Sequence, residues 1–185
     1  MKKIILLVCV TLFCCVGNSL AQTTKKEMTR QEKKEKQKAM EQALFEEAKQ
    51  AIENKAFTLE ANQVIFKRGK SAFVSSNTNF VMVDGDRASV QVAFNIPVSG
   101  PNGLGGVTVD GNVSGYKIKT DKKGTMYLTM NVMGIGISAQ VSITLPHGSN
   151  NATVDIRPNF NSNRLTLSGE LLPLDKSNVF KGRSF

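Results

Sequence analysis

From Ala56 onward, apolar and polar residues alternate with a period of two, and this alternation restricts the fold of the chain more than any other feature. Period two places every second side chain on the same face of a β-strand. One apolar face and one polar face per strand are typical of antiparallel sheets with one buried side. The pattern occupies the stretches 57–62, 88–95, 116–119, 125–132, 137–145, 152–157 and 164–168.

Short turn sequences separate these stretches. Asp84-Gly85-Asp86, Asp121-Lys122-Lys123-Gly124 and His147-Gly148-Ser149-Asn150 are three of them. Gly, Asp and Asn at such positions favour tight turns between neighbouring antiparallel strands. We therefore expect a mainly β fold over residues 56–175, an antiparallel up-and-down β-barrel or a sandwich of about eight strands.

The first 21 residues have the three parts of a secretory signal peptide. Lys2 and Lys3 form a cationic start, and the apolar run 4–16 is shorter than the ~20 residues that a membrane-spanning helix needs. Small residues at Ser19 and Ala21 predict cleavage after Ala21. The expected location is therefore secreted or periplasmic.

All three cysteines, Cys9, Cys14 and Cys15, lie within this signal. The mature chain is thus expected to have no disulfide, no thiol nucleophile and no thiolate metal site. Lipid attachment at Cys14 or Cys15 is an alternative to cleavage after Ala21. It is disfavoured because the large residues Leu12 and Phe13 precede the cysteines, where small residues are required.

Residues 22–55 form a charged arm that precedes the β domain. A helical stripe of Met40, Ala43/Leu44, Ala48 and Ala51/Ile52 predicts one helix over about 29–54, with Thr29 and Glu32 as a capping box. Its first half is expected in solvent and its second half docked on the barrel. The Lys25–Lys38 arm is either a soluble spacer or an electrostatic tether to an anionic envelope surface. At the other end of the chain, 176–185 is expected to form a basic tail.

The chain resembles a family of secreted proteins of Bacteroides-like bacteria, known as domain of unknown function 4251. The resemblance is carried by Phe57-Thr58-Leu59-Glu60-Ala61-Asn62, by Val81-Met82-Val83-Asp84-Gly85-Asp86 and by the stretch 163–173. The chain has Ala93-Phe94-Asn95-Ile96-Pro97 where such proteins often have a Leu-Pro-Tyr-Phe-Gly type stretch. The resemblance implies a lipocalin-like barrel and supplies no activity and no site residues.

Groups for catalysis or metal binding are few. His147 is the only histidine and lies in a predicted turn, so neither a serine triad nor a histidine zinc site is expected. A pair of carboxylates is the one catalytic arrangement left open. The candidates for such a pair are Glu60, Asp110, Asp155 and Glu170. Each of them can also be interpreted as an acidic side chain in solvent. We expect a protein that is not an enzyme and has no cofactor.

The formal net charge of +9 raises the question of a nucleic-acid partner. Proteins that bind nucleic acids interleave aromatic side chains with their cations. Here the phenylalanines are scattered or belong to the apolar alternation. We expect no nucleic-acid partner.

The apolar strand face is the remaining place for a function, because an eight-stranded barrel is either filled by side chains or holds one small ligand. Methionines on this face, Met82 among them, suit irregular apolar ligands. The candidate ligand-binding residues are Val90, Val92, Phe94, Tyr116, Met126, Met130 and Val141. A plain packed core is the simpler interpretation of the same pattern.

Two functions are compatible with these features. The first is an envelope protein that binds a small apolar or amphiphilic ligand inside the barrel. The second is a structural or partner-binding module that acts through the basic helix and the barrel surface.

Overall fold

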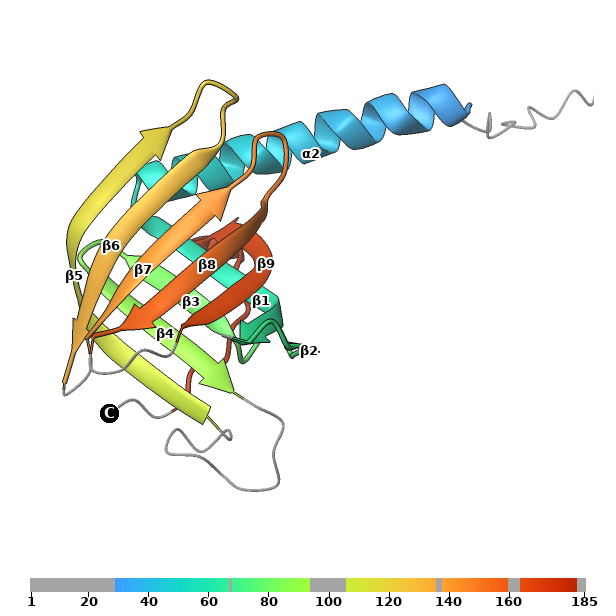
Figure 1. Ribbon diagram of the computed structural model, residues 1–185. Helices are drawn as coiled ribbons and strands as arrows, with labels where there is room; N and C mark the ends of the chain where they lie inside the picture. Colours follow the sequence, from blue (N-terminus) through green and yellow to red (C-terminus); the bar gives the residue numbers. More distant parts are fainter. Residues whose placement is uncertain (1–28, 67, 94–105, 136–137, 160–163, 183–185) are drawn as a thin grey trace, which may run out of the picture. The chain divides into compact units, whose positions relative to one another are not determined.

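The strands form one antiparallel sheet whose first and last long strands meet (Figure 1). The computed structural model describes residues 29–66, 68–93, 106–135, 138–159 and 164–182. The strands in these ranges are β1 (Ala56–Phe66), β2 (Ser71–Phe73), β3 (Phe80–Asp84), β4 (Arg87–Ala93), β5 (Gly106–Thr120), β6 (Met126–Gly134), β7 (Ser138–Leu145), β8 (Asn151–Pro158) and β9 (Leu165–Pro173).

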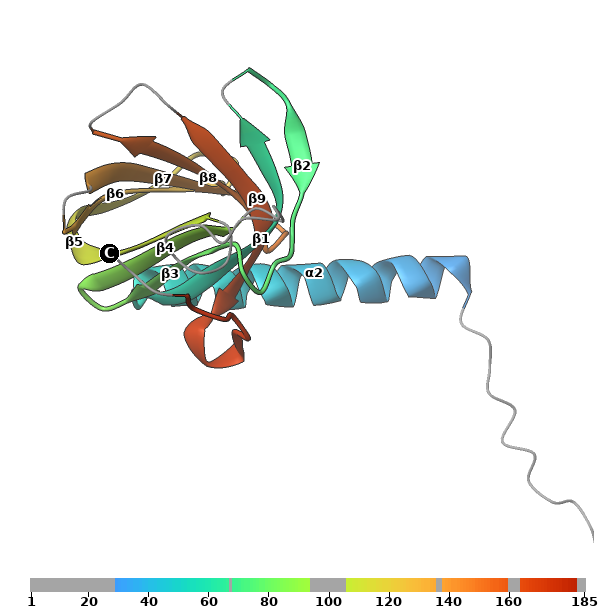
Figure 2. The ribbon, with the colours of Figure 1, turned by 90° about the horizontal axis from the view of Figure 1, so that it is seen from below.

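Neighbours in the sheet follow the order β2-β1-β3-β4-β5-β6-β7-β8-β9, and β1 also pairs with β9. In the described part of the chain, eight strands therefore close a barrel, and the short β2 is an extra strand on β1. Figure 2 shows the ring of strands from below. The predicted antiparallel barrel is confirmed, and the sandwich alternative is not what forms.

The helix α2 (Arg30–Glu53) precedes β1 and starts at the predicted capping box. The Thr29 amide donates to Glu32 Oε2 at 2.7 Å, and the Glu32 amide donates to Thr29 Oγ1 at 3.3 Å. These two bonds satisfy amides that have no partner within the helix. Within the described residues, neither α2 nor the short η1 (Leu174–Lys176) is both long and apolar enough to cross a membrane.

The helix docks through its second half, as predicted. Residues 35–41 are exposed, and the buried face consists of Phe45, Ala48, Ala51 and Ile52. The predicted stripe was wrong at Met40, which is 64% exposed, and at Ala43, which is also exposed. Phe45 is buried instead, because Phe45, Ala48 and Ile52 recur at spacings of three and four on one helix face.

Large apolar side chains fill the half of the barrel that faces α2. The inward residues of β6 and β7 in this half are Met126, Leu128, Met130, Val141, Ile143 and Leu145. They form one buried cluster with the docked residues of α2. In the turn after β7, the ring centroid of His147 lies 4.9 Å from that of Phe45. Residues 35–53 of α2 therefore cover the barrel end that holds this turn (Figure 1).

The segment after β9 lies on the outer surface of the barrel. Ser177 Oγ and the Asn178 amide donate to Glu60 Oε1 at 2.9 and 3.1 Å. The buried Gln91 donates to the Phe180 carbonyl at 2.8 Å and accepts from the Gly182 amide at 2.7 Å. Within the expected basic tail, residues 177–182 are thus hydrogen-bonded to β1 and β4.

Candidate functional site

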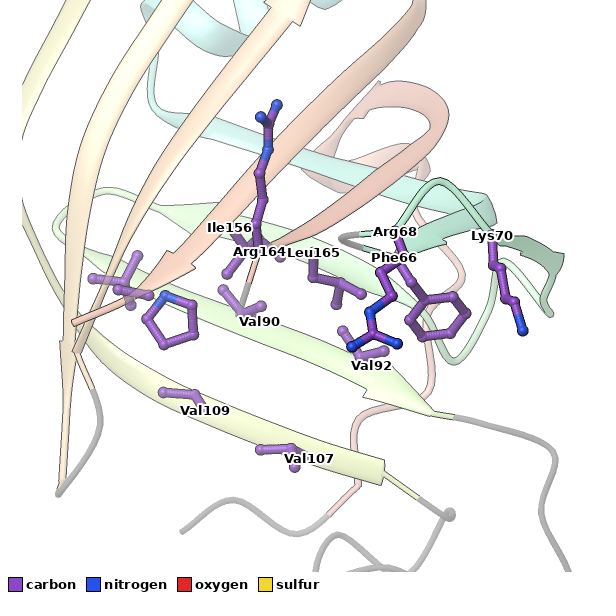
Figure 3. A pocket seen from close by; sticks show the side chains of 13 residues that line it. Phe66, Arg68, Lys70, Val90, Val92, Val107, Val109, Ile156, Arg164 and Leu165 are labelled. Carbon is purple, nitrogen blue, oxygen red and sulfur yellow. The ribbon is translucent and has the colours of Figure 1, made fainter. Parts of the chain in front are cut away.

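A cavity of about 590 Å³ occupies the half of the barrel that the packed cluster leaves unfilled (Figure 3). The residues that line this cavity come from neighbouring strands of the barrel, where pairing places them side by side. Phe66 pairs with Leu165 and Leu165 with Ile156, while Val92 pairs with Val107 across β4 and β5. The wall is completed by Val90, Val109, Val132, Ala139 and Pro158.

The difference between the two halves of the barrel follows from side-chain size. Inward positions near α2 carry Met, Leu and Ile, and the docked Phe45 and Ile52 add further volume. Most inward positions around the cavity carry Val or Ala, which do not reach the barrel axis. An eight-stranded barrel has room for one small ligand when its side chains do not fill it. A volume of about 590 Å³ is within the range of small-molecule sites in proteins.

The charged side chains that line the cavity, within the described residues, are all cationic: Arg68, Lys70 and Arg164. Arg68 and Lys70 belong to the turn between β1 and β2. Two main-chain hydrogen bonds hold this turn, from the Phe66 amide to the Lys70 carbonyl and from the Gly69 amide to the Phe66 carbonyl, both 2.8 Å. Gly69 has a φ of +78°, a left-handed conformation that glycine adopts without strain. The two cations are therefore fixed to a tight turn at the cavity mouth.

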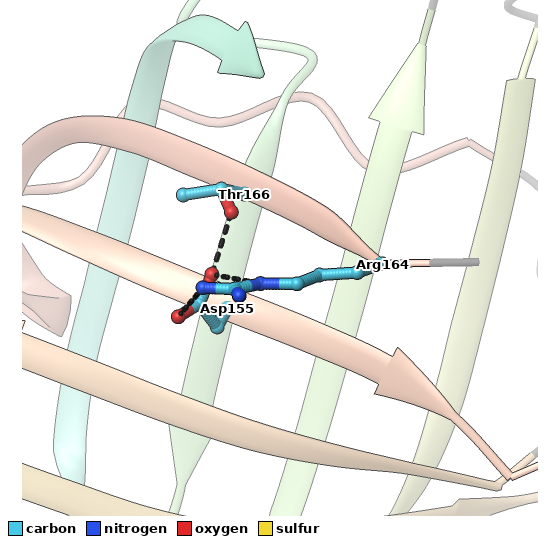
Figure 4. A network of polar contacts seen from close by, with 3 residues as sticks. All are labelled: Asp155, Arg164 and Thr166. Carbon is cyan, nitrogen blue, oxygen red and sulfur yellow. Dashed lines mark hydrogen bonds and ion pairs between the residues drawn. The ribbon is translucent and has the colours of Figure 1, made fainter. Parts of the chain in front are cut away.

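Arg164 is paired with Asp155 on the outer wall (Figure 4). Its Nε and Nη2 atoms donate to Asp155 Oδ1 and Oδ2 at 3.0 and 2.6 Å, and Thr166 Oγ1 donates to Oδ1 at 2.5 Å. Partial burial acts to raise the pKa of Asp155, but the hydrogen bonds from Arg164 and Thr166 outweigh it, and the pKa lies below its usual value. Asp155 is thus a charged partner of Arg164, and the Arg164 charge is largely neutralised.

The predicted ligand-binding residues fall into separate places. Val90 and Val92 belong to the buried cluster and also line the cavity. Met126, Met130 and Val141 belong to the same cluster but are not among the lining residues of the cavity. Tyr116 packs against this cluster and donates from its hydroxyl to the Ile52 carbonyl at 2.5 Å, and burial raises its pKa. Phe94 lies outside the described residues.

Met82 was expected on the inner face and lies on the outer one. Its neighbours Val81 and Val83 belong to the buried cluster, so Met82 alternates to the opposite side of β3. It pairs with Thr58 of β1 and Ser89 of β4.

Several cavity residues were missed in the sequence. Val107 and Val109 alternate with Thr108 and Asp110 at the start of β5, which is a usable period-two signal. Arg68 and Lys70 follow the apolar end of β1, but no local pattern indicates that their turn stands beside a cavity.

The potential catalytic groups do not line the cavity. His147 is exposed in the turn beside Phe45. Asp110 is bonded to Ser89 and paired with Lys181 at 2.7 Å, and Glu60 accepts from the C-terminal segment. Glu170 is exposed and is the register partner of Glu60. Within the described ranges, no group of three His, Cys, Asp or Glu side chains could hold a metal ion.

Comparison with known proteins gives a family and a fold. Residues 37–171 match the family model described as Domain of unknown function (DUF4251). The fold is similar to the crystal structure of a DUF4251 family protein from Bacteroides eggerthii, with a TM-score of 0.69 and 57% sequence identity. The match covers 80% of this chain and 99% of that one. No curated protein matches the chain.

Proposed function

This chain belongs to the DUF4251 family, which is defined by a domain of unknown function, and we propose that it is a non-enzymatic protein that binds a small apolar or amphiphilic ligand in its barrel. The observation that carries the proposal is the cavity of about 590 Å³ beside a packed, helix-covered half. The aliphatic wall offers dispersion contacts and excludes water, and its lining among the described residues includes no nucleophile and no acid–base pair. Such a lining suits binding better than chemistry.

The direct test is native mass spectrometry of the mature protein, purified from its own host without detergent. An added mass that disappears on denaturation supports the proposal and identifies the ligand. To cover loss of a weak ligand during purification, the apo protein is titrated with a dansyl-labelled undecanoic acid and its methyl ester. Failure of the native protein to carry a ligand and of both probes to bind would overturn the proposal.

A cavity-filling variant locates the binding. Val109 lines the cavity, and Val109→Phe adds an aromatic ring to the space that a ligand would occupy. We expect probe affinity to fall at least about tenfold, the equivalent of about 1.4 kcal/mol. The matched control is Thr153→Phe, which adds the same ring at an exposed position of β8. Equal affinity in both variants would place the probe elsewhere.

The proposed place of action is outside the cytoplasm. The support is the cationic start, short apolar run and small-residue exit of the first 21 residues. Fractionation of the native host, with amino-terminal sequencing, is expected to give a mature chain that begins at Gln22. Retention in the cytoplasm with an intact start would contradict export, and lipid on Cys14 or Cys15 would support anchoring instead.

A second candidate function is partner binding through the basic helix. It is favoured by the exposure of Lys36, Lys38 and Met40 on α2, since an exposed methionine beside lysines offers both apolar and ionic contacts. Deletion of 23–38 from the mature protein is expected to abolish capture of partners from envelope extracts. Unchanged capture by a folded deletion variant would reject this function.

A further inference from the structure

The cavity is apolar inside and cationic at its mouth. Most of its wall is built from aliphatic side chains of the strands β4 to β9. The charged lining residues are Arg68, Lys70 and Arg164, and no acidic side chain is among the lining residues that the structure describes. A molecule that fills this site therefore meets an apolar surface along its length and positive charge at one end.

Two of the three cations are available to a ligand. Arg164 is held by Asp155 through two hydrogen bonds, and Figure 3 shows its guanidinium directed away from the cavity valines. Arg68 and Lys70 are exposed, and the ion pairs between described residues involve other side chains. In Figure 3 the Arg68 side chain extends beside Phe66, at the same side of the cavity as Lys70.

The connections from β1 to β2, from β4 to β5, from β6 to β7 and from β8 to β9 contain no Asp or Glu. Arg68 and Lys70 stand on either side of Gly69 in the hydrogen-bonded turn, so both cations are anchored at one point of the cavity mouth. Arg and Lys at such a position favour a carboxylate, sulfate or phosphate group.

We infer that the ligand is an anionic amphiphile: a single apolar chain lies against the valines of the cavity, and its acidic head group binds Arg68 and Lys70. This inference rests on the proposed function, to which it adds the polarity of the ligand and its direction in the barrel. The chain enters first, toward the packed cluster, and the head stays at the mouth. Fatty acids and single-chain alkyl phosphates or sulfates share this chemistry.

The test compares the same two probes, the dansyl-labelled undecanoic acid and its methyl ester, which differ in charge at one end. We expect the acid to bind about tenfold more tightly than the ester, because hydrogen bonds to a charged group are stronger than those to a neutral one. The preference is expected to shrink as salt rises, since the cations are exposed and screened. Dodecanoate and dodecylamine, measured by calorimetry, repeat the comparison with opposite charges.

Removing the charges of Arg68 and Lys70 tests whether these two residues bind the acidic head group. The double variant Arg68→Gln/Lys70→Gln is expected to bring the affinity for the acid down to that for the ester and to leave the ester unchanged. The matched control is Lys122→Gln/Lys123→Gln, which removes two charges from the turn between β5 and β6. Circular dichroism and thermal unfolding confirm that all variants are folded.

Each outcome separates this inference from the proposed function. Equal binding of acid and ester would overturn the anionic head group while leaving the ligand-binding function in place. Loss of the acid preference in the control variant would show a general charge effect and would overturn the assignment to Arg68 and Lys70. Absence of binding by both probes, together with a native protein that carries no ligand, would remove the function and the inference together.

A last experiment tests whether the anionic ligand is a free molecule or a lipid head group within a bilayer. Vesicles of phosphatidylcholine with phosphatidylglycerol are sedimented with the protein. Dodecanoate binding without sedimentation supports a free single-chain ligand. Sedimentation that Arg68→Gln/Lys70→Gln abolishes, without dodecanoate binding, would overturn the cavity as the site and indicate a membrane surface.

Discussion

The hydroxyl of Tyr116 donates a hydrogen bond of 2.5 Å to the main-chain carbonyl of Ile52 and so joins β5 to the end of α2. The last carbonyls of a helix have no i+4 amide within the helix, and the Ile52 carbonyl accepts from the Lys55 amide at 3.1 Å as well as from Tyr116. The contact therefore helps to fix where the helix ends against the barrel.

Tyr116→Phe removes this bond and keeps the ring. We expect the free energy of unfolding to fall by about 1 kcal/mol, since one of the two hydrogen bonds that the Ile52 carbonyl accepts is lost and the bond from the Lys55 amide remains. Urea denaturation measures the change. The control is Tyr127→Phe, whose hydroxyl makes a long, exposed contact of 3.4 Å with Asp121. Equal effects of the two variants would contradict a special role for the Tyr116 bond.

Phe45→Ala tests the cover that α2 provides. Phe45 is 3% exposed and belongs to the buried cluster, so its removal is expected to cost about 3–5 kcal/mol of unfolding free energy. Met40→Ala on the exposed face is expected to change it by less than about 0.5 kcal/mol. Thermal unfolding of both variants measures the difference. A small effect at Phe45 would mean that the barrel end is stable without the helix.

Thr58→Val is expected to stabilise the protein. Thr58 is fully buried on the outer face of β1, and its hydroxyl has no hydrogen-bond partner among the described residues. Replacing the hydroxyl by a methyl group of similar size removes a desolvated polar atom, worth about 1 kcal/mol. Chemical denaturation checks the sign. Destabilisation by Thr58→Val would indicate that the hydroxyl is satisfied in solution.

The lowered pKa of Asp155 predicts that the folded protein loses unfolding free energy at acidic pH. Its pKa is lower in the folded protein than in the unfolded chain, so its contribution is complete above the unfolded pKa of about 4. The contribution is lost as the pH falls through the lower, folded pKa. We expect Asp155→Asn to lose less unfolding free energy than the parent protein between about pH 6 and about pH 3.

Arg164→Gln is the matched variant for this pH dependence. It keeps the carboxylate and removes one of the groups that lower its pKa. Its stability profile is expected to flatten in the same direction as that of Asp155→Asn. Parallel profiles for the parent and both variants would show that the pair contributes nothing to the acid sensitivity.

The strands were predictable because period two is a local signal that one buried face imposes on each strand. The same reasoning failed at Met82, since Val81-Met82-Val83 is apolar on both faces. There η1 packs on β1 and β3 from outside, so the outer face of β3 is partly covered and the alternation disappears. A strand that is covered on both sides does not reveal in its sequence which face points inward.

The cavity was only partly predictable. Val90 and Val92 follow from the alternation in β4, but Met126 and Met130 have the same periodicity and lie in the packed half. Whether an inward residue touches a neighbour or an empty space depends on the side chains across the ring. That information is spread over strands far apart in the sequence, as is the pairing of Arg164 with Asp155.

The pairing of β1 with β9 has a consequence for how the protein is made. The first barrel strand to leave the ribosome has one of its partners at the end of the chain, so no amino-terminal fragment forms the ring. Such distant pairing slows folding, and until it occurs β1 presents an unpaired edge that other chains are able to join. Closure therefore has to wait until β9 is made, and a protein truncated before Leu165 is expected to aggregate.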